Sequence, residues 1–320
     1  VDPWYWLRDD QRAHPEVIGY LEAENAYRHT MLAHLQPFEQ YLYEEIVGRI
    51  KQDDSTVPAR HNGYWYYTRF EPGSEYPIYA RRKATLTAPE EILIDANLRA
   101  AGRDYYQIAS LEVSPDSRLI AFTEDCVGRR EYELRFIDTE TGRELPDVIR
   151  CVEPDLAWAD DNCTVVYVEK DPKTLLGCRI RKHLLGSPTT LDPLVYEEAD
   201  DSFYLGVERS KSERHLYIVS QSTVSSEYRW ADAADPQLHF QVALPRERDH
   251  EYQLEHLGER FVIRSNWQAH NFRIVEVPLA EVTDRSRWRD VVAHRSEAFV
   301  AGFEIFERYL AVSERSGGLR

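Results

Sequence analysis

Apolar and polar residues follow two different patterns along this chain, one before and one after about residue 60. Between Val17 and Leu35 apolar side chains recur every three or four positions, and the same spacing returns between Phe38 and Ile50. This spacing predicts two helices, each with one apolar face. The first should begin near His14-Pro15, because proline is favoured in the first helical turn. The aromatic run Trp4–Trp6 precedes these helices. Because large aromatic side chains usually pack against protein, we expect it to anchor the N-terminus to a protein surface and not to bind a ligand.

Beyond Gly63 the helical spacing disappears, and short runs of β-branched and aromatic residues predict strands. The clearest example is Val113–Asp125, in which two apolar runs flank Pro115 and Asp116. Proline presets φ for a turn, and the aspartate carboxylate can accept hydrogen bonds from nearby backbone N–H groups. The segment therefore predicts a β-hairpin.

The second strand of this hairpin returns along the chain at a regular interval. The first residues of successive copies are 55, 46, 51, 45 and 49 residues apart. A repeat of about 45–50 residues with four strands per unit is typical of a β-propeller blade. The aligned segments are Tyr64–Tyr67, Leu119–Phe122, Val165–Val168, Leu216–Val219, Phe261–Arg264 and Leu310–Val312.

Each repeat divides into four predicted strands. In the hairpin's repeat these are residues 108–114, 119–124, 132–138 and 145–150, and in the next repeat 156–158, 165–169, 179–184 and 194–197. Two more units run through 203–247 and 252–292, and a sixth begins at Phe299 and stops after two strands. An open propeller leaves an unpaired edge and an uncovered apolar face, so we expect the protein to continue beyond Arg320.

The predicted organisation is thus an all-β fold, a β-propeller of about five and a half blades, preceded by a helical segment. Residues 51–58 are polar, rich in turn-forming residues and without a period, which is typical of a linker. We therefore divide the chain into a helical segment with its linker, residues 1–58, and an incomplete propeller, residues 59–320.

Composition changes this picture only in one respect, the formal net charge of −17. Such acidity argues against nucleic acid, whose phosphates select basic surfaces, and is compatible with cationic peptides or amines. Acidity that serves only solubility remains the simpler explanation. No apolar run is long enough for a membrane span, and the four cysteines at 126, 151, 163 and 178 show no metal or disulfide spacing. We therefore expect reduced thiols, no membrane contact and a cytoplasmic location.

No catalytic or cofactor-binding motif is found in these residues. The chain has no G-x-S-x-G, H-E-x-x-H, P-loop or G-x-G-x-x-G segment, so neither catalytic residues nor a cofactor are predicted within it. His250 and His256 flank two glutamates, but on one strand they would lie about 20 Å apart, too far to share a metal ion. We therefore predict no metal site there.

Charged loops on one face of the propeller are the best candidates for a functional surface. In a four-stranded antiparallel blade the loops after strands two and four emerge on the same face. Arg129 and Arg130 follow a second strand and Asp104 follows a fourth, so we expect these residues to share that face and to line an interdomain surface or gate. Solvated loop charge is the alternative, because isolated exposed pairs contribute only about 0–1 kcal/mol.

Several segments, in one register over essentially the whole chain, resemble the N-terminal half of oligopeptidase B, in the prolyl oligopeptidase family of serine peptidases. The most specific is Tyr20–Tyr27, because helix, linker and repeats follow it in the family's order. The others are Asp2–Asp10, Glu75–Tyr79, Tyr196–Glu198 and Pro245–Tyr252.

The resemblance implies a seven-bladed propeller that caps an α/β-hydrolase domain carrying Ser, Asp and His. It also implies that the N-terminal segment packs on that domain, that the propeller restricts entry to short peptides, and that cleavage follows Arg or Lys. None of the triad or selector positions has a counterpart in these residues. The expected partners are thus short basic peptides and the hydrolase domain of the same protein. A non-enzymatic propeller that binds a protein through its loop face is the alternative, and a dipeptidyl-peptidase relative is a third, less favoured hypothesis.

Overall fold

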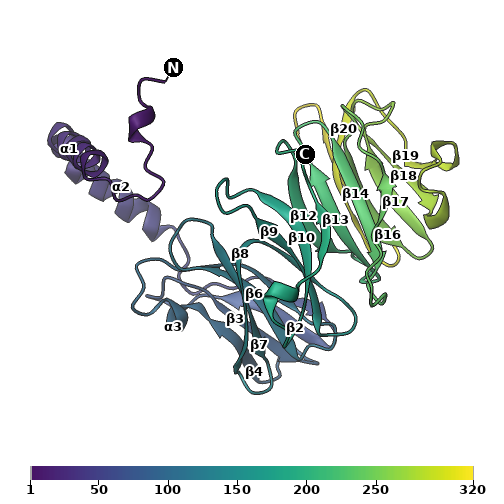
Figure 1. The fold of residues 1–320 in the computed structure, drawn as a ribbon, viewed down its shortest axis with the longest axis horizontal. Coiled ribbons are helices and arrows are strands. Elements are labelled where there is room, and N and C mark those ends of the chain that lie inside the picture. The colour runs from purple at the N-terminus through teal and green to yellow at the C-terminus, as the bar shows by residue number, and fades with distance from the viewer. Residues whose placement is uncertain (1, 320) are drawn as a thin grey trace. The chain divides into compact units, whose positions relative to one another are not determined.

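A computed structural model describes residues 2–319. The chain forms two compact units, one made of Val1–Ser55 with Phe70–Ser74 and the other of Thr56–Arg69 with Glu75–Arg320. The first unit is helical and the second is built of strands (Figure 1). Val1 and Arg320, the outermost residues of the two predicted domains, lie outside the described residues.

The helical unit follows the predicted spacing. A 3-10 turn, η1 (Tyr5–Leu7), precedes α1 (Pro15–Leu32), which continues through η2 (Ala33–Leu35) into α2 (Gln36–Gly48). Pro15 is the first helical residue, as expected. The Asp9 carboxylate accepts backbone N–H bonds from Ala13 and His14, both at 2.6 Å, and thus holds the chain where it enters α1.

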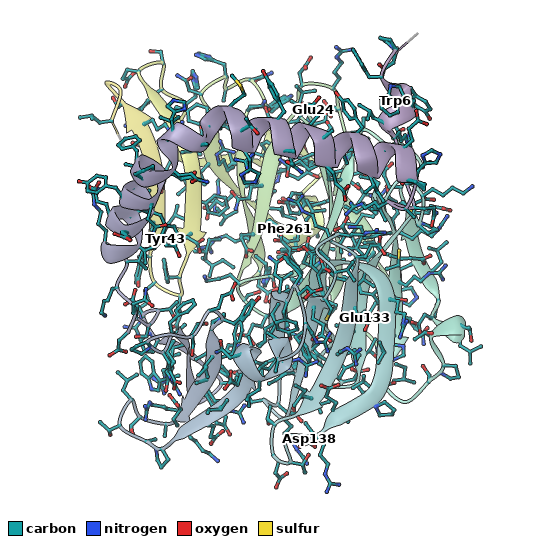
Figure 2. The ribbon with its side chains drawn as sticks, turned by 90° about the vertical axis from the view of Figure 1, so that its left-hand side faces the viewer. Trp6, Glu24, Tyr43, Glu133, Asp138 and Phe261 are labelled. Carbon is teal, nitrogen blue, oxygen red and sulfur yellow. The ribbon has the colours of Figure 1, made fainter. Side chains whose placement is uncertain are left out.

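The apolar face of these helices is largely uncovered within this chain. Val17 is the one apolar side chain that is buried among the described residues of the helical unit. Trp6 contacts Tyr20 edge to face, with ring centroids 5.4 Å apart, but Tyr43 is 63% exposed. Figure 2 shows Trp6, Glu24 and Tyr43 on these elements. The other exposed side chains of this set include Trp4, Tyr5, Leu21, Tyr27, Met31, Phe38, Tyr41 and Ile46.

The second unit is a series of antiparallel blades, and the predicted count of five and a half is confirmed. The first blade is β1 (Ala59–His61), β2 (Tyr64–Arg69), β3 (Ile78–Lys83) and β4 (Glu90–Asp95). The next two blades share one sheet of β5 (Gln107–Val113), β6 (Leu119–Asp125), β7 (Tyr132–Asp138), β8 (Glu144–Trp158), β9 (Thr164–Lys170), β10 (Gly177–Leu184) and β11 (Leu194–Glu197). The remaining strands are β12 (Tyr204–Arg209), β13 (His215–Gln221), β14 (Ser226–Asp232), β15 (Gln241–Leu244), β16 (Tyr252–Leu257), β17 (Arg260–Ser265), β18 (Arg273–Pro278), β19 (Arg289–Val292), β20 (Ala298–Ile305) and β21 (Leu310–Ser316).

Each of the six segments aligned in the sequence is the second strand of its blade. They fall in β2, β6, β9, β13, β17 and β21. In β6, β9, β13 and β17 this strand has a neighbour on both edges and carries a continuous buried run, whereas β21 has one neighbour and alternates between half-buried and exposed side chains. In β6 the side chains from Ile120 to Thr123 are all 0% exposed, and Phe261 of β17 is likewise fully buried (Figure 2).

One strand differs from the prediction. The segments 145–150 and 156–158 are not separate strands, because β8 runs unbroken from Glu144 to Trp158 and joins two blades into one seven-stranded sheet. The register shifts between Val152 and Leu156, and Cys151 has a φ of 59°. A bulge of this kind bends a strand without ending it, so one strand serves two blades.

The turn of the Val113–Asp125 hairpin is structural. Asp116 accepts hydrogen bonds from the Ser114 hydroxyl at 2.7 Å and from the Arg118 backbone at 3.1 Å. Its own backbone N–H donates to Asn162 Oδ1, 2.8 Å away, in the corresponding turn of the next blade. The repeated turn thus ties neighbouring blades together. A short helix that the pattern did not predict, α3 (Ala96–Ala100), follows β4 and is capped by Asp95.

Candidate functional site

The loop that holds Arg129 and Arg130 is anchored by a buried carboxylate. Asp125, 1% exposed, accepts backbone N–H bonds from Val127 at 2.8 Å, Gly128 at 2.9 Å and Arg130 at 2.7 Å. The Arg130 carbonyl accepts a bond of 2.9 Å from Lys170, whose side chain is 4% exposed. The backbone of this loop is therefore held firmly, while the Arg130 side chain is exposed.

The structure brings this loop next to the one that contains Asp104. The guanidinium of Arg103 donates to the Cys126 sulfur, and a Cβ built on Gly128 would lie 3.4 Å from the ring of Tyr105. A cavity of about 640 Å³ opens between the two loops, with Tyr105 and Arg130 in its wall. The shared location of the two loops is thus observed, and the role of Arg129, Arg130 and Asp104 in an interdomain surface stays a prediction.

Glu124, at the end of β6, is part of a buried ion cluster. Its side chain is 1% exposed and lies 2.8 Å from Arg99 Nη2, 2.7 Å from Arg135 Nε and 2.8 Å from the hydroxyl of Tyr106. Arg99 connects α3 to β6 and β7 through this carboxylate. Glu124 therefore stabilises the blade and does not present charge to a ligand.

A second ion cluster lies between the third and fourth blades, and the sequence did not single it out as a site. Glu198 pairs with Arg246 and accepts a bond of 2.8 Å from the Tyr196 hydroxyl, and Arg246 also lies 3.3 Å from Glu227. Burial alone would raise the pKa of Glu198, but the hydrogen bonds from Arg246 and Tyr196 outweigh it and lower that pKa to about 2. Two segments that carry the family resemblance, Tyr196–Glu198 and Pro245–Tyr252, thus contact each other through Arg246.

Acidic side chains also gather along the first strands of the blades. Glu112 of β5, Asp155 of β8 and Glu208 of β12 line one cavity of about 650 Å³, and Glu255 of β16 follows in the next blade. Burial and then the charge of Asp155 raise the pKa of Glu112 to about 7, and burial raises that of Glu255 to about 7. The sequence does contain a hint of these acidic residues, because Glu112-Val-Ser114 and Glu208-Arg-Ser210 share a glutamate two residues before a serine.

His250 and His256, the two histidines weighed as metal ligands, each contact a different serine hydroxyl. His250 Nε2 lies 2.9 Å from Ser265 Oγ, and His256 Nδ1 lies 2.7 Å from Ser212 Oγ. Across residues 2–319, no three or more His, Cys, Asp or Glu side chains are arranged to hold a metal ion. The four cysteines are free and partly buried, and burial raises the pKa of each thiol, so none is an activated nucleophile.

No helix in the described part of the chain is long and apolar enough to cross a lipid bilayer.

Comparison with known proteins places these features in a family. The model of the prolyl oligopeptidase N-terminal β-propeller domain matches residues 1–320. Dipeptidyl aminopeptidase BI from Pseudoxanthomonas mexicana is 49% identical over 99% of this chain and 46% of its own length. Protease 2 from Moraxella lacunata is 30% identical over 99% of this chain and 46% of its own length. The chain therefore spans less than half the length of these curated relatives.

Solved structures agree with the sequence relatives. Oligopeptidase B from Leishmania major superposes with a TM-score of 0.93 at 28% identity, over 99% of this chain and 45% of that one. Oligopeptidase B from Trypanosoma brucei, in a closed form with bound antipain, gives a TM-score of 0.90 at 26% identity, with the same coverage. The resemblance seen in the sequence is thus confirmed, and the chain belongs to the prolyl oligopeptidase family, of which it forms the N-terminal β-propeller part.

Proposed function

We propose that this chain is the N-terminal segment and propeller of a cytoplasmic serine oligopeptidase that cleaves short peptides after Arg or Lys. The observation that carries the proposal is the match to oligopeptidase B over 99% of the chain at a TM-score of 0.93. An α/β-hydrolase domain of the same protein would supply a serine nucleophile, with histidine as its general base. The exposed aromatic face of α1 and α2 would pack on that domain, and the propeller would admit peptides by size.

The relative at 49% identity favours a second candidate function, because its name describes removal of dipeptides from a free amino end. The two functions differ in whether the substrate's N-terminus must be unblocked. Hydrolysis of an N-acylated Arg-amide substrate should be compared with that of the free dipeptide Ala-Arg-amide. Equal kcat/KM supports the oligopeptidase, whereas turnover of the free dipeptide alone supports the dipeptidyl aminopeptidase. Failure of a serine-directed inhibitor to stop either reaction would contradict both.

A polypeptide of these 320 residues alone is expected to hydrolyse neither substrate, because none of the triad residues is assigned within it. The measurement is product release by the purified 320-residue chain, with the serine-directed inhibitor as control. Inhibitor-sensitive turnover would contradict this prediction. If the protein is instead a non-enzymatic binding module, the complete protein should also release no product.

The gating role of the Arg129–Arg130 loop has its own test in the complete protein. Asp125 and Lys170 hold the loop through its backbone, so Arg130→Glu should change stability by no more than about 0.5 kcal/mol. If Arg130 faces the substrate path, kcat/KM for a basic peptide, or its salt dependence, should change several-fold. Arg118→Glu is the matched control, because Arg118 is 66% exposed on a turn between first and second strands. If the two substitutions changed kcat/KM equally, Arg130 would be an exposed loop charge with no role in gating.

A further inference from the structure

The turn between β12 and β13 in the fourth blade, Ser210–Arg214, contacts blades that do not lie beside it. Glu213 Oε1 lies 2.6 Å from Nε2 of His61, which belongs to β1 in the first blade. Lys211 Nζ lies 3.2 Å from Glu304 Oε2, which belongs to β20 in the sixth blade. Since the blades of a propeller pack on their neighbours, both contacts reach past the blades that lie between.

The equivalent turn of the second blade, Ser114–Ser117, contacts the blades on either side of it. The Pro115 carbonyl accepts a bond of 3.0 Å from Asn62 Nδ2 in the first blade. The Asp116 backbone N–H donates to Asn162 Oδ1 in the third blade, 2.8 Å away. The long reach of the β12–β13 turn is therefore not a general property of the repeat.

Side-chain length explains the difference between the two turns. They share a backbone conformation, with a φ of 64° at Ser117 and 61° at Glu213. Lys211 and Glu213 occupy the positions that Pro115 and Ser117 occupy in the second blade. Two long charged side chains thus replace two short ones, and they extend to the sixth and the first blade.

The backbone of the β12–β13 turn is fixed on the blades beside it. The Lys211 backbone N–H donates to Glu255 Oε2 of the fifth blade, 3.0 Å away. Arg209 Nη1 donates to the Trp158 carbonyl of the third blade at 2.7 Å, and Arg209 Nη2 donates to the Glu213 carbonyl at 2.6 Å. The third and fifth blades therefore determine where the turn lies.

The contacts with the two distant blades are weaker than those with the neighbours. The side chains of Lys211 and Glu304 are 55% and 63% exposed, and those of His61 and Glu213 are 39% and 41% exposed. Exposed pairs of this kind stabilise a protein little, and salt screens the charged ones. The fourth blade instead shares a buried apolar core with the third blade and another with the fifth. The first and sixth blades thus separate from the turn more easily than its neighbours do.

The contact with the first blade also completes the wall of a cavity. His61, Lys211 and Glu213 line the cavity of about 650 Å³, together with residues from the first strands of the second and third blades. The first and fourth blades are the outermost of the four that form this wall. The contact between His61 and Glu213 therefore joins its two ends, and separation there would open the wall.

We propose that the β12–β13 turn is a clamp across the propeller, fixed on the third and fifth blades, that holds the first blade through Glu213 and the sixth through Lys211. Each of these two blades is released when its own contact breaks, and salt favours release of the sixth. The inference goes beyond the proposed function and does not depend on it, because it concerns only contacts within the propeller.

The test is amide hydrogen exchange of the complete protein, measured by mass spectrometry on peptides from β1–β2 and from β20–β21. Lys211→Glu places like charges together, so exchange in β20–β21 should accelerate about three- to tenfold while β1–β2 is unchanged. Glu213→Ala removes the partner of His61 and should accelerate β1–β2 but not β20–β21. Raising the salt concentration from about 0.05 M to about 0.5 M should accelerate β20–β21 in the unsubstituted protein.

Arg214→Glu is the matched control, because it reverses the same charge in the same turn. Arg214 pairs with Glu259 of the neighbouring fifth blade, at 3.6 Å, so this variant should leave exchange in both segments within about twofold. The double variant Lys211→Glu/Glu304→Lys restores the ion pair with its charges exchanged and should return β20–β21 to its original rate. Lys211→Met removes the ammonium group without adding repulsion and should give the pattern of Lys211→Glu with a smaller factor.

Three results would overturn the clamp. One is an acceleration by Arg214→Glu as large as that by Lys211→Glu, which would show an effect of turn charge in general. Another is uniform acceleration in all blades, which would show global destabilisation. The third is unchanged exchange in both segments for Lys211→Glu and Glu213→Ala, which would show that the two contacts hold neither blade.

Discussion

Replacing Glu124 by alanine is expected to lower the free energy of unfolding by about 2–4 kcal/mol, because it removes the buried carboxylate that two partly buried guanidinium groups share. Arg99 is 18% and Arg135 24% exposed by side chain, and both lie within 2.8 Å of Glu124. The Tyr106 hydroxyl, at 2.8 Å, loses its acceptor as well. Urea denaturation followed by tryptophan fluorescence measures the loss.

The control for this prediction is Glu140→Ala. Glu140 also pairs with an arginine, Arg118 at 3.5 Å, but its side chain is 76% exposed. Exposed pairs contribute about 0–1 kcal/mol, so this variant should be nearly neutral. If Glu124→Ala lowered the free energy of unfolding no more than Glu140→Ala, water would be replacing the lost hydrogen bonds of Arg99 and Arg135. That result would contradict the structural role of Glu124.

Replacing His215 by phenylalanine is expected to stabilise the protein, and more so at pH 5 than at pH 7.5. His215 is 4% exposed, and neither ring nitrogen has a hydrogen-bond partner among the described residues. The ring packs edge to face on Trp230 and His256, at centroid distances of 5.0 and 4.4 Å. A phenylalanine ring fills the same space without burying unpartnered nitrogens, so the gain should be about 1–2 kcal/mol at pH 7.5.

The pH dependence follows from the direction of the histidine pKa shifts. Burial, and then neighbouring positive charge, lowers the pKa of His256 and that of His250 from 6.5 to about 4, and burial lowers that of His215. The unfolded chain therefore binds protons more readily than the folded one. Stability from these histidines is complete above pH 6.5 and is lost as the pH falls below it; for His250 and His256 the loss extends toward pH 4 and is about 1–3 kcal/mol each.

Two carboxyl groups on first strands, Glu112 and Glu255, act in the opposite direction over an overlapping pH range. The folded protein raises the pKa of Glu112 and of Glu255 from 4.5 to about 7, so protonation favours the folded state. These groups add stability as the pH falls from 7 toward 4.5 and thus offset part of the loss from the histidines. His215→Phe removes one contribution from the first group, so its free energy of unfolding should fall less between pH 6.5 and 5 than that of the unsubstituted protein.

Urea denaturation at pH 7.5, 6 and 5 measures both effects of His215→Phe. His239→Phe is the matched control, because that imidazole is 80% exposed and should give no such gain. A variant less stable than the unsubstituted protein at pH 7.5 would mean that the His215 nitrogens have favourable partners, and a parallel pH profile would mean that His215 does not titrate in this range.

The blade pattern was predictable from the sequence because the contacts that form a blade are local. Each strand pairs with the next along the chain, and the turn Ser114–Ser117 carries Pro115 and Asp116, which favour a turn. The continuous β8 was not predictable, because whether a strand ends or bends depends on the blade that packs beside it. The helices were likewise predictable from their spacing, but not the exposure of their apolar face, since a periodic pattern does not say what covers it.

The sequence by itself determined the propeller, its blade count, the helical segment and the family resemblance, because these rest on repeats and on spacing along the chain. It also led to Arg129, Arg130 and Asp104, whose loops the structure brings together. Only the tertiary structure decided that Glu112, Asp155 and Glu208 line one cavity and that His215 lies against His256. The physical reason is that side chains from different blades meet through blade stacking, which no local pattern encodes.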